Sequence, residues 1–358
     1  YKIPSEYDIV SFEKCGFCYA NVLASLSDYD DYYMRHNSYC KEILGKAPDN
    51  LTKDAVMDLL CSISHKDDKI LDIGFDKGEL LLLLQRHGFR NLFGIDPSEE
   101  SVEHMRKSGI RAETGSIYTS DSLEEKMNMV VVTDVLEHLL KPSLALEKIS
   151  SVLRDGGLLY VSVPNCLNLE RDTSPLCNNF NQEHINYFSV TSLKNLMARY
   201  GFKEEKMIAE AKYTDIFAVF SYHERTVEDF FEKDIWTREA IKAYIKYNDR
   251  RETHYNRILE KYVRDQIPVA VWGTGSFTMS LLVNTDLRYC RIECFIDNNE
   301  MRQKEQFWGG KAVIAADGLC GCPCVEAVVV SSIRSSAEIR RQLLEMGWED
   351  KKIIVLEE

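Results

Sequence analysis

The feature that most constrains the fold is a regular alternation of short apolar runs and helical segments, which begins near residue 51. Apolar runs of strand length occupy residues 69–74, 91–96, 129–133 and 158–163, and segments with helical periodicity lie between them. Strands that alternate with helices in this way form βαβ units around a parallel sheet. The sequence therefore predicts a doubly wound α/β domain.

A second alternation of the same kind begins at residue 267. Before it, residues 201–222 contain two neighbouring strands, which we expect to close the first sheet as an antiparallel hairpin. The predicted fold is α/β, with a Rossmann-like seven-stranded domain and a second, smaller Rossmann-like domain. The predicted parts are an N-terminal segment (1–45), the first domain (46–222), a charged helical connector (223–265) and the C-terminal domain (266–358).

Composition excludes two classes of partner. The formal net charge is −13 and basic residues do not cluster, which argues against a nucleic-acid partner. No apolar run is longer than that of Leu80–Leu84, which is far too short to span a membrane.

The 11 cysteines are scattered and odd in number, which is typical of reduced thiols. We therefore expect a cytoplasmic protein.

The ends of the first two apolar runs carry the pattern of a ligand site. Ligands of open parallel sheets bind beyond the carboxyl ends of the strands. Gly74 allows a tight turn there, and Gly78 allows close packing of the next helix on the sheet. Asp96 follows the second run, where an acid can accept both hydroxyls of a ribose, and Pro97 opens the next helix.

This pattern leaves three interpretations open: a purely structural turn, an NAD site and an S-adenosylmethionine site. Asp72 lies in the turn, where a carboxylate can pair with an ammonium group but repels a pyrophosphate. The three-glycine fingerprint of dinucleotide sites is incomplete, and adenosylmethionine has no phosphate. These two details favour S-adenosyl-L-methionine as the cofactor.

The chain also resembles class I adenosylmethionine-dependent methyltransferases. The matching motifs, in order, are Leu71–Gly74, Asp96, Val132–His138, Leu153–Gly157 and Val161–Asn165. Within that class, Gln182–Ser189 followed by a Leu-rich helix and Gly201–Phe202 is similar to the branch that contains sugar C-methyltransferases. The resemblance extends into the C-terminal domain.

The resemblance implies a role for each motif residue of the donor site. Asp72 and the Gly74 turn would hold the methionine end of the cofactor, and Asp96 would hold its ribose. Ser116–Ile117 would lie near the adenine, and Asp134 would line the cofactor pocket.

Asp76 departs from the family pattern, because members usually have glycine at that position. Aspartate tolerates a left-handed backbone better than most residues. We therefore expect the turn to survive.

The N-terminal segment resembles a remnant of the zinc module that opens many members of the family. Phe12 stands where a cysteine is expected, and Cys15 and Cys18 alone cannot complete a four-ligand zinc site. We therefore expect no metal. Three tyrosines of this segment form either a lid over the substrate or a packed aromatic cluster: Tyr32, Tyr33 and Tyr39.

The acceptor site is predicted in the polar loop after the strand at 158–163. Methyl transfer requires removal of the acceptor's proton, which favours a group that is neutral near pH 7, such as histidine. In sugar C-methyltransferases a Glu-His pair carries this chemistry, and the resemblance assigns it to Glu183 and His184, with Tyr187 donating to the oxyanion. A structural or capping role for His184 is the alternative. For His138 we expect a structural role.

The sequence thus predicts a methyltransferase that acts on a small polar acceptor, such as a sugar nucleotide, with carbon as the preferred atom. Oligomerisation is possible. An alternative is an NAD(P)-linked oxidoreductase that uses the turn at Gly273–Gly275 with Asp297. A second alternative is a catalytically silent binding protein.

Overall fold

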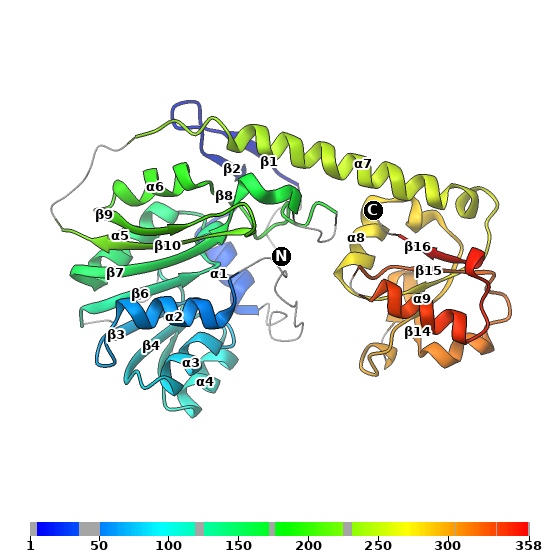
Figure 1. The fold of residues 1–358 in the computed structure, drawn as a ribbon, viewed down its shortest axis with the longest axis horizontal. Coiled ribbons are helices and arrows are strands. Elements are labelled where there is room, and N and C mark those ends of the chain that lie inside the picture. Colours follow the sequence, from blue (N-terminus) through cyan, green and yellow to red (C-terminus); the bar gives the residue numbers. More distant parts are fainter. Residues whose placement is uncertain are drawn as a thin grey trace. The chain divides into compact units, whose positions relative to one another are not determined.

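The computed structural model describes residues 6–35, 51–118, 125–171, 176–224, 231–304, 306–333 and 335–356. These residues divide into two compact units (Figure 1). The first lies within residues 1–172 and 181–242, and the second within residues 173–180 and 243–358.

The first unit is built on a seven-stranded sheet with the order β5-β4-β3-β6-β7-β10-β9. Its first five strands are parallel, whereas β10 pairs antiparallel with both β7 and β9. The predicted seven-stranded α/β fold and its closing antiparallel hairpin are thereby confirmed. The strands are β3 (Lys69–Ile73), β4 (Asn91–Asp96), β5 (Arg111–Thr114), β6 (Met127–Thr133), β7 (Leu153–Pro164), β9 (Phe202–Ile208) and β10 (Asp215–Tyr222).

Helices cover both faces of this sheet. Successive residues of a strand point to opposite sides, and the apolar residues on each side pack against helices. On β3, Ile70 packs in the core beneath α2 (Lys53–Ile63), α3 (Glu79–Arg86) and α4 (Glu99–Lys107). Leu71 and Ile73 pack in the opposite core with α5 (Pro142–Val152) and α6 (Val190–Ala198), on the other face in Figure 1. Such two-sided burial explains the uninterrupted apolar runs in the sequence.

The N-terminal residues form a small sheet of their own with a distant part of the chain. Strands β1 (Asp8–Ser11) and β2 (Cys18–Asn21) make a hairpin, and β2 pairs with β8 (Asn186–Tyr187). Helix α1 (Leu26–Arg35) follows this hairpin. The pairing holds the N-terminal segment against the motif that contains Glu183 and His184.

The second unit is an α/β fold built on a six-stranded sheet of order β13-β14-β12-β11-β15-β16. All its pairings are parallel except that of β13 with β14. The strands are β11 (Val269–Trp272), β12 (Ile292–Ile296), β13 (Gln306–Phe307), β14 (Lys311–Ile314), β15 (Ala327–Val330) and β16 (Ile353–Val355); the helices that follow strands are α8 (Ser276–Asn284) and α9 (Ser336–Glu345).

Several elements differ from the sequence-based expectation. Strand β7 begins at Leu153 rather than at residue 158: Leu153 already pairs with Met127 of β6, and the register then shifts across the segment that contains Gly156, whose φ is +71°. The connector helix α7 occupies only Thr237–Arg264. The short strands β13 and β14 are not foreseen, because they lie in a polar, glycine-rich stretch. Within the described residues, no helix combines the length and apolarity needed to cross a membrane.

Candidate active site

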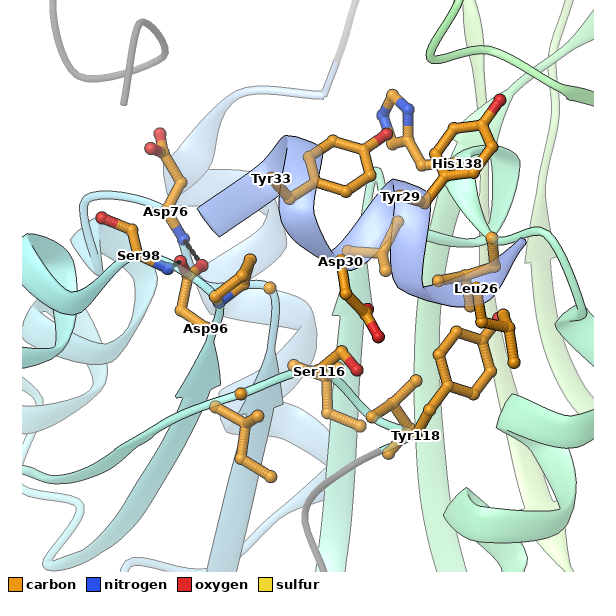
Figure 2. Close-up of a pocket in the computed structure, with 18 of the residues that line it drawn as sticks. Leu26, Tyr29, Asp30, Tyr33, Asp76, Asp96, Ser98, Ser116, Tyr118 and His138 are labelled. Carbon is orange, nitrogen blue, oxygen red and sulfur yellow. Dashed lines mark hydrogen bonds between the residues drawn. The ribbon is translucent and has the colours of Figure 1, made fainter. Parts of the chain in front are cut away.

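A pocket opens beyond the carboxyl ends of the parallel strands β3 to β6, where the fold predicts ligand binding. Helix α1 crosses over it, as Figure 2 shows. Six of the eight residues that the sequence assigns to the cofactor line its wall: Gly74, Asp96, Pro97, Ser116, Ile117 and Asp134.

Asp96 ends β4 and is held rigidly at the pocket wall. Its Oδ2 accepts a hydrogen bond from the backbone N–H of Asp76 at 2.8 Å, and its Oδ1 accepts one from the N–H of Ser98 at 2.8 Å (Figure 2). Burial raises the pKa of Asp96 to about 6, although the two N–H groups act in the opposite direction. Within the described part of the chain, no lysine or arginine forms an ion pair with this buried carboxylate.

Asp72 and Gly78, the other two assigned residues, do not line the pocket. Asp72 is buried on β3, and burial together with the nearby charge of Asp96 raises its pKa to about 7. Gly78 has a φ of +67°, and a Cβ there would lie 2.2 Å from the sulfur of Met105 on α4. Gly78 therefore permits close packing beside α4.

The turn after β3 has the tight geometry that a close ligand requires. Gly74 has a φ of +71°, and a Cβ on it would lie 2.6 Å from Cγ2 of Val135, another residue of the pocket wall. Asp76 also has a positive φ, 50°. The expectation that aspartate would preserve this turn in a left-handed conformation is confirmed.

Helix α1 contributes four residues to the pocket wall: Leu26, Tyr29, Asp30 and Tyr33. In Figure 2, Asp30 points from α1 toward Ser116. Burial raises the pKa of Asp30, and its hydrogen bond with Ser116 partly offsets that rise. The sequence analysis missed Asp30, because α1 is placed by the long-range pairing of the N-terminal hairpin with β8.

Of the three tyrosines proposed as a lid, Tyr33 lines the pocket and its ring lies 6.2 Å from that of His138 in an edge-on arrangement. The hydroxyl of Tyr32 donates to Oε1 of Glu183 at 2.6 Å. Tyr39 lies outside the described residues.

His138 is the histidine that reaches the pocket. It ends a short 3-10 turn (Leu136–His138) after β6. Its Nδ1 lies 2.9 Å from the backbone carbonyl of Glu183, and because a carbonyl only accepts, Nδ1 donates. Its ring stands edge-on to that of His184, with centroids 4.9 Å apart. The sequence analysis gave His138 only a structural role.

The predicted catalytic residues lie next to His138. Asn181 Oδ1 accepts hydrogen bonds from the backbone N–H groups of Glu183 and His184, both at 2.8 Å. Burial, followed by the neighbouring His138, lowers the pKa of His184 to about 3. Tyr187 is buried on β8, opposite Cys18, and burial raises its pKa. None of the predicted trio, Glu183, His184 and Tyr187, is part of the described pocket wall.

In the second unit, a comparable turn follows β11. The carboxylate of Asp297 accepts hydrogen bonds from the backbone N–H and the hydroxyl of Thr274, at 3.2 and 2.5 Å. Asn299 donates its N–H to the other carboxylate oxygen at 2.9 Å. Asp297, at the end of β12, is therefore hydrogen-bonded to the turn after β11, just as Asp96 at the end of β4 is hydrogen-bonded to the turn after β3.

Comparison with known proteins identifies the first unit. Residues 39–206 match a family model described as a methyltransferase domain. Together with the seven-stranded sheet, this match shows a class I, S-adenosylmethionine-dependent methyltransferase domain.

Curated relatives match only part of this chain. A tRNA U34 carboxymethyltransferase of Campylobacter hominis is 29% identical over 99 residues, which are 26% of this chain and 35% of that protein. A ubiquinone biosynthesis O-methyltransferase of Chelativorans sp. is 32% identical over 105 residues, 27% of this chain and 40% of that protein. The aligned region thus spans well under half the length of these relatives.

Solved structures resemble the chain at low identity. The magnesium protoporphyrin IX methyltransferase of Synechocystis, solved with bound SAH, has a TM-score of 0.43 and 17% identity, and the match covers 55% of this chain and all of that one. A 1,6-didemethyltoxoflavin-N1-methyltransferase of Burkholderia thailandensis has a TM-score of 0.44 and 14% identity, with 60% and 99% covered.

Proposed function

We propose that this chain, which contains an adenosylmethionine-dependent methyltransferase domain, methylates a small polar acceptor bound beside His138. One observation carries the proposal: a single pocket has the fixed carboxylate of Asp96 on one part of its wall and the imidazole of His138 on another. A donor whose ribose is held at Asp96 and an acceptor next to His138 would then share one cavity.

The residues present fit the donor. Asp96 supplies carboxylate oxygens for ribose hydroxyls, and Gly74, whose Cβ would collide with Val135, lets the backbone turn tightly at the pocket wall. Asp134, whose Oδ1 accepts from the Ser162 hydroxyl at 2.8 Å, adds a negative charge suited to a cationic ligand. The bound donor supplies an activated methyl group: the acceptor atom bonds to the methyl carbon while the carbon–sulfur bond breaks and leaves its electrons on sulfur.

The remaining task of the protein is to position the acceptor and to let its proton leave. The carbonyl of Glu183 holds the Nδ1–H of His138, so that Nε2 keeps its lone pair. His184 packs against this ring. The finer parts of the proposal are a sugar nucleotide as the acceptor and carbon as the methylated atom. Glu183, His184 and Tyr187 would take part in the proton chemistry. The protein would act in the cytoplasm, where it could form oligomers.

Donor binding can be tested without knowledge of the acceptor. Titration calorimetry of the full chain with S-adenosylmethionine is expected to show one site, and Asp96→Ala should weaken it by at least about tenfold, since two ribose hydrogen bonds are lost. Asp297→Ala is the matched control, because Asp297 ends a strand in the second unit with a similar pattern of turn hydrogen bonds. Equal loss in both variants, or no binding by the wild type, would refute the proposal.

Acceptor chemistry needs a separate assay. The full chain is incubated with methyl-labelled donor and a panel of keto-sugar nucleotides, simple sugars and phenols. Transfer to a keto-sugar, with exchange of its α-proton in deuterated water, would support carbon methylation. Transfer to a phenol or hydroxyl without such exchange would replace carbon with oxygen, and inertness across the panel together with absent donor binding would favour a silent binding protein.

A further inference from the structure

We propose that Glu137, His138 and His184 bind a divalent transition-metal cation at the border of the donor pocket. This inference rests on the proposed function, because it assigns to the same site a way of activating the acceptor. It also departs from the sequence analysis, which expected no metal.

The first observation is the convergence of three ligand atoms. One oxygen of Glu137 and one nitrogen from each histidine all lie within 4.8 Å of one another. They come from two segments that the fold fixes independently. Glu137 and His138 belong to the 3-10 turn after β6, whereas His184 precedes β8, which is paired with the N-terminal hairpin.

The second observation is that one oxygen of the buried Glu137 carboxylate lacks a hydrogen-bond partner. Its side chain is 2% exposed, and its Oε2 has no hydrogen-bond partner within the described part of the chain. The closest cation candidate for Oε1 is Nε2 of His138, at 3.6 Å, which is longer than a hydrogen bond. A buried carboxylate oxygen without a partner is costly, and a bound cation would supply one.

The third observation concerns the tautomer of His138. Its Nδ1 donates to the carbonyl of Glu183, so Nε2 presents a lone pair toward Glu137. A lone pair and a carboxylate oxygen repel each other unless a proton or a cation lies between them. Ligating histidines commonly donate their other N–H to a backbone carbonyl in this way.

The donor set indicates the class of ion. Two imidazole nitrogens and one carboxylate oxygen suit Zn²⁺ and related first-row cations such as Mn²⁺ and Co²⁺. Three protein ligands leave a position open for water or substrate, as in catalytic zinc sites. Because His138 lines the pocket, we expect that position to receive an oxygen of the acceptor.

A cation there would act as a Lewis acid without changing its oxidation state. For a hydroxyl acceptor it would promote loss of the O–H proton to solvent, and the oxygen would then attack the methyl carbon. For a carbon acceptor it would stabilise the negative charge on the oxygen of the enolate formed when the α-proton leaves. Either way one proton is released and the methyl group is transferred.

The test counts bound Mn²⁺ by electron paramagnetic resonance after the full chain has been dialysed against a chelator. Mn²⁺ is chosen because it disfavours thiolates, and the chain has free cysteines outside this cluster. We expect one bound ion, displaced by Zn²⁺. Glu137→Gln and His184→Ala should each weaken binding by at least about tenfold. The matched control is His87→Ala, at an exposed histidine whose Nδ1 lies 2.8 Å from the carbonyl of Leu83 in its own helix.

Thermal unfolding of each variant without metal shows whether it is folded. Glu137→Gln keeps the size of the side chain, so a loss of Mn²⁺ in a folded Glu137→Gln protein supports the site. Absence of Mn²⁺ and Zn²⁺ binding in the wild type overturns it, as does binding that survives both ligand substitutions. Donor titration separates the two proposals: a chain that binds adenosylmethionine but no metal loses only this inference, whereas one that binds metal but no donor loses only the proposed function.

Discussion

The backbone N–H of Asp76 donates to Oδ2 of Asp96 across 2.8 Å and thereby joins the turns that follow two neighbouring parallel strands. The donating residue has a φ of 50°, a conformation that L-residues rarely adopt. The orientation of the Asp96 carboxylate therefore depends on the left-handed backbone conformation of Asp76, in the turn after the neighbouring strand.

Replacement of Asp76 by glycine should preserve this arrangement. Glycine adopts positive φ without steric cost, and the substitution removes a negative charge that raises the pKa of Asp96. We expect Asp76→Gly to bind adenosylmethionine at least as tightly as the wild type, with a stability change within about 1 kcal/mol. Asp76→Val should destabilise the protein by about 1–3 kcal/mol and weaken binding, because a β-branched residue is strained there. Calorimetry and thermal unfolding measure both; a glycine variant that loses the donor would contradict the expectation.

A comparison of two glycines tests the space at the first turn. Gly74 and Gly88 both have positive φ, but a Cβ on Gly74 would lie 2.6 Å from Val135, whereas one on Gly88 would meet nothing within 4 Å. Gly88→Ala should therefore cost about 1 kcal/mol from backbone strain alone. Gly74→Ala should cost more and also weaken donor binding, since Val135 lines the pocket. Denaturant unfolding and donor titration of both variants provide the check. Equal losses of stability and of donor affinity in the two variants would show that Gly74 is not packed against Val135.

The sheet and the donor side of the pocket were predictable because their causes are local. Apolar runs such as the one ending at Asp96 are buried on both faces, and strand ends of a parallel sheet meet at one edge. Gly74 and Asp96 could be assigned from this rule and from the family motifs. The residues that escaped prediction depend on contacts between distant segments.

Asp30 and His138 illustrate that limit. Asp30 reaches the pocket only because the N-terminal hairpin pairs with β8 and is followed by α1. His138 acquires its tautomer from the carbonyl of Glu183, 45 residues further along the chain. Neither contact can be predicted from the strand and helix periodicities of the sequence. Asp72, by contrast, was assigned to the cofactor from its motif, yet its side chain is buried outside the pocket wall.

Asp30 should contribute to donor binding through its charge. Its carboxylate lies in the pocket wall beside Ser116, and the donor is cationic. We expect Asp30→Asn to weaken adenosylmethionine binding by about tenfold, with a smaller effect on the uncharged product S-adenosylhomocysteine. Asp31→Asn is the control, because Asp31 is the next residue of the same helix, is exposed and lies outside the pocket wall. Titrations with both ligands test this, and equal effects of Asp30→Asn on both would assign Asp30 a steric role instead.

The buried carboxylate of Asp96 also makes stability depend on pH. Burial raises its pKa from 3.8 to about 6 in the folded protein. A raised pKa of an acid means that the folded state holds the proton more tightly than the unfolded chain does. The resulting stabilisation is complete below the unfolded pKa near 3.8 and is lost as pH rises through about 6. Each unit of difference corresponds to about 1.4 kcal/mol.

Without donor, the melting temperature of Asp96→Asn should therefore rise relative to that of the wild type between pH 5 and pH 7.5, because asparagine has no proton to lose. Donor binding has the opposite dependence, since a cationic ligand favours the ionised carboxylate. In the wild type, the increase in melting temperature caused by saturating adenosylmethionine should grow over the same pH range, and this growth should be reduced in Asp96→Asn. Differential scanning fluorimetry across this range measures both trends. A donor-induced shift that falls as pH rises would place the positive charge of the donor away from Asp96.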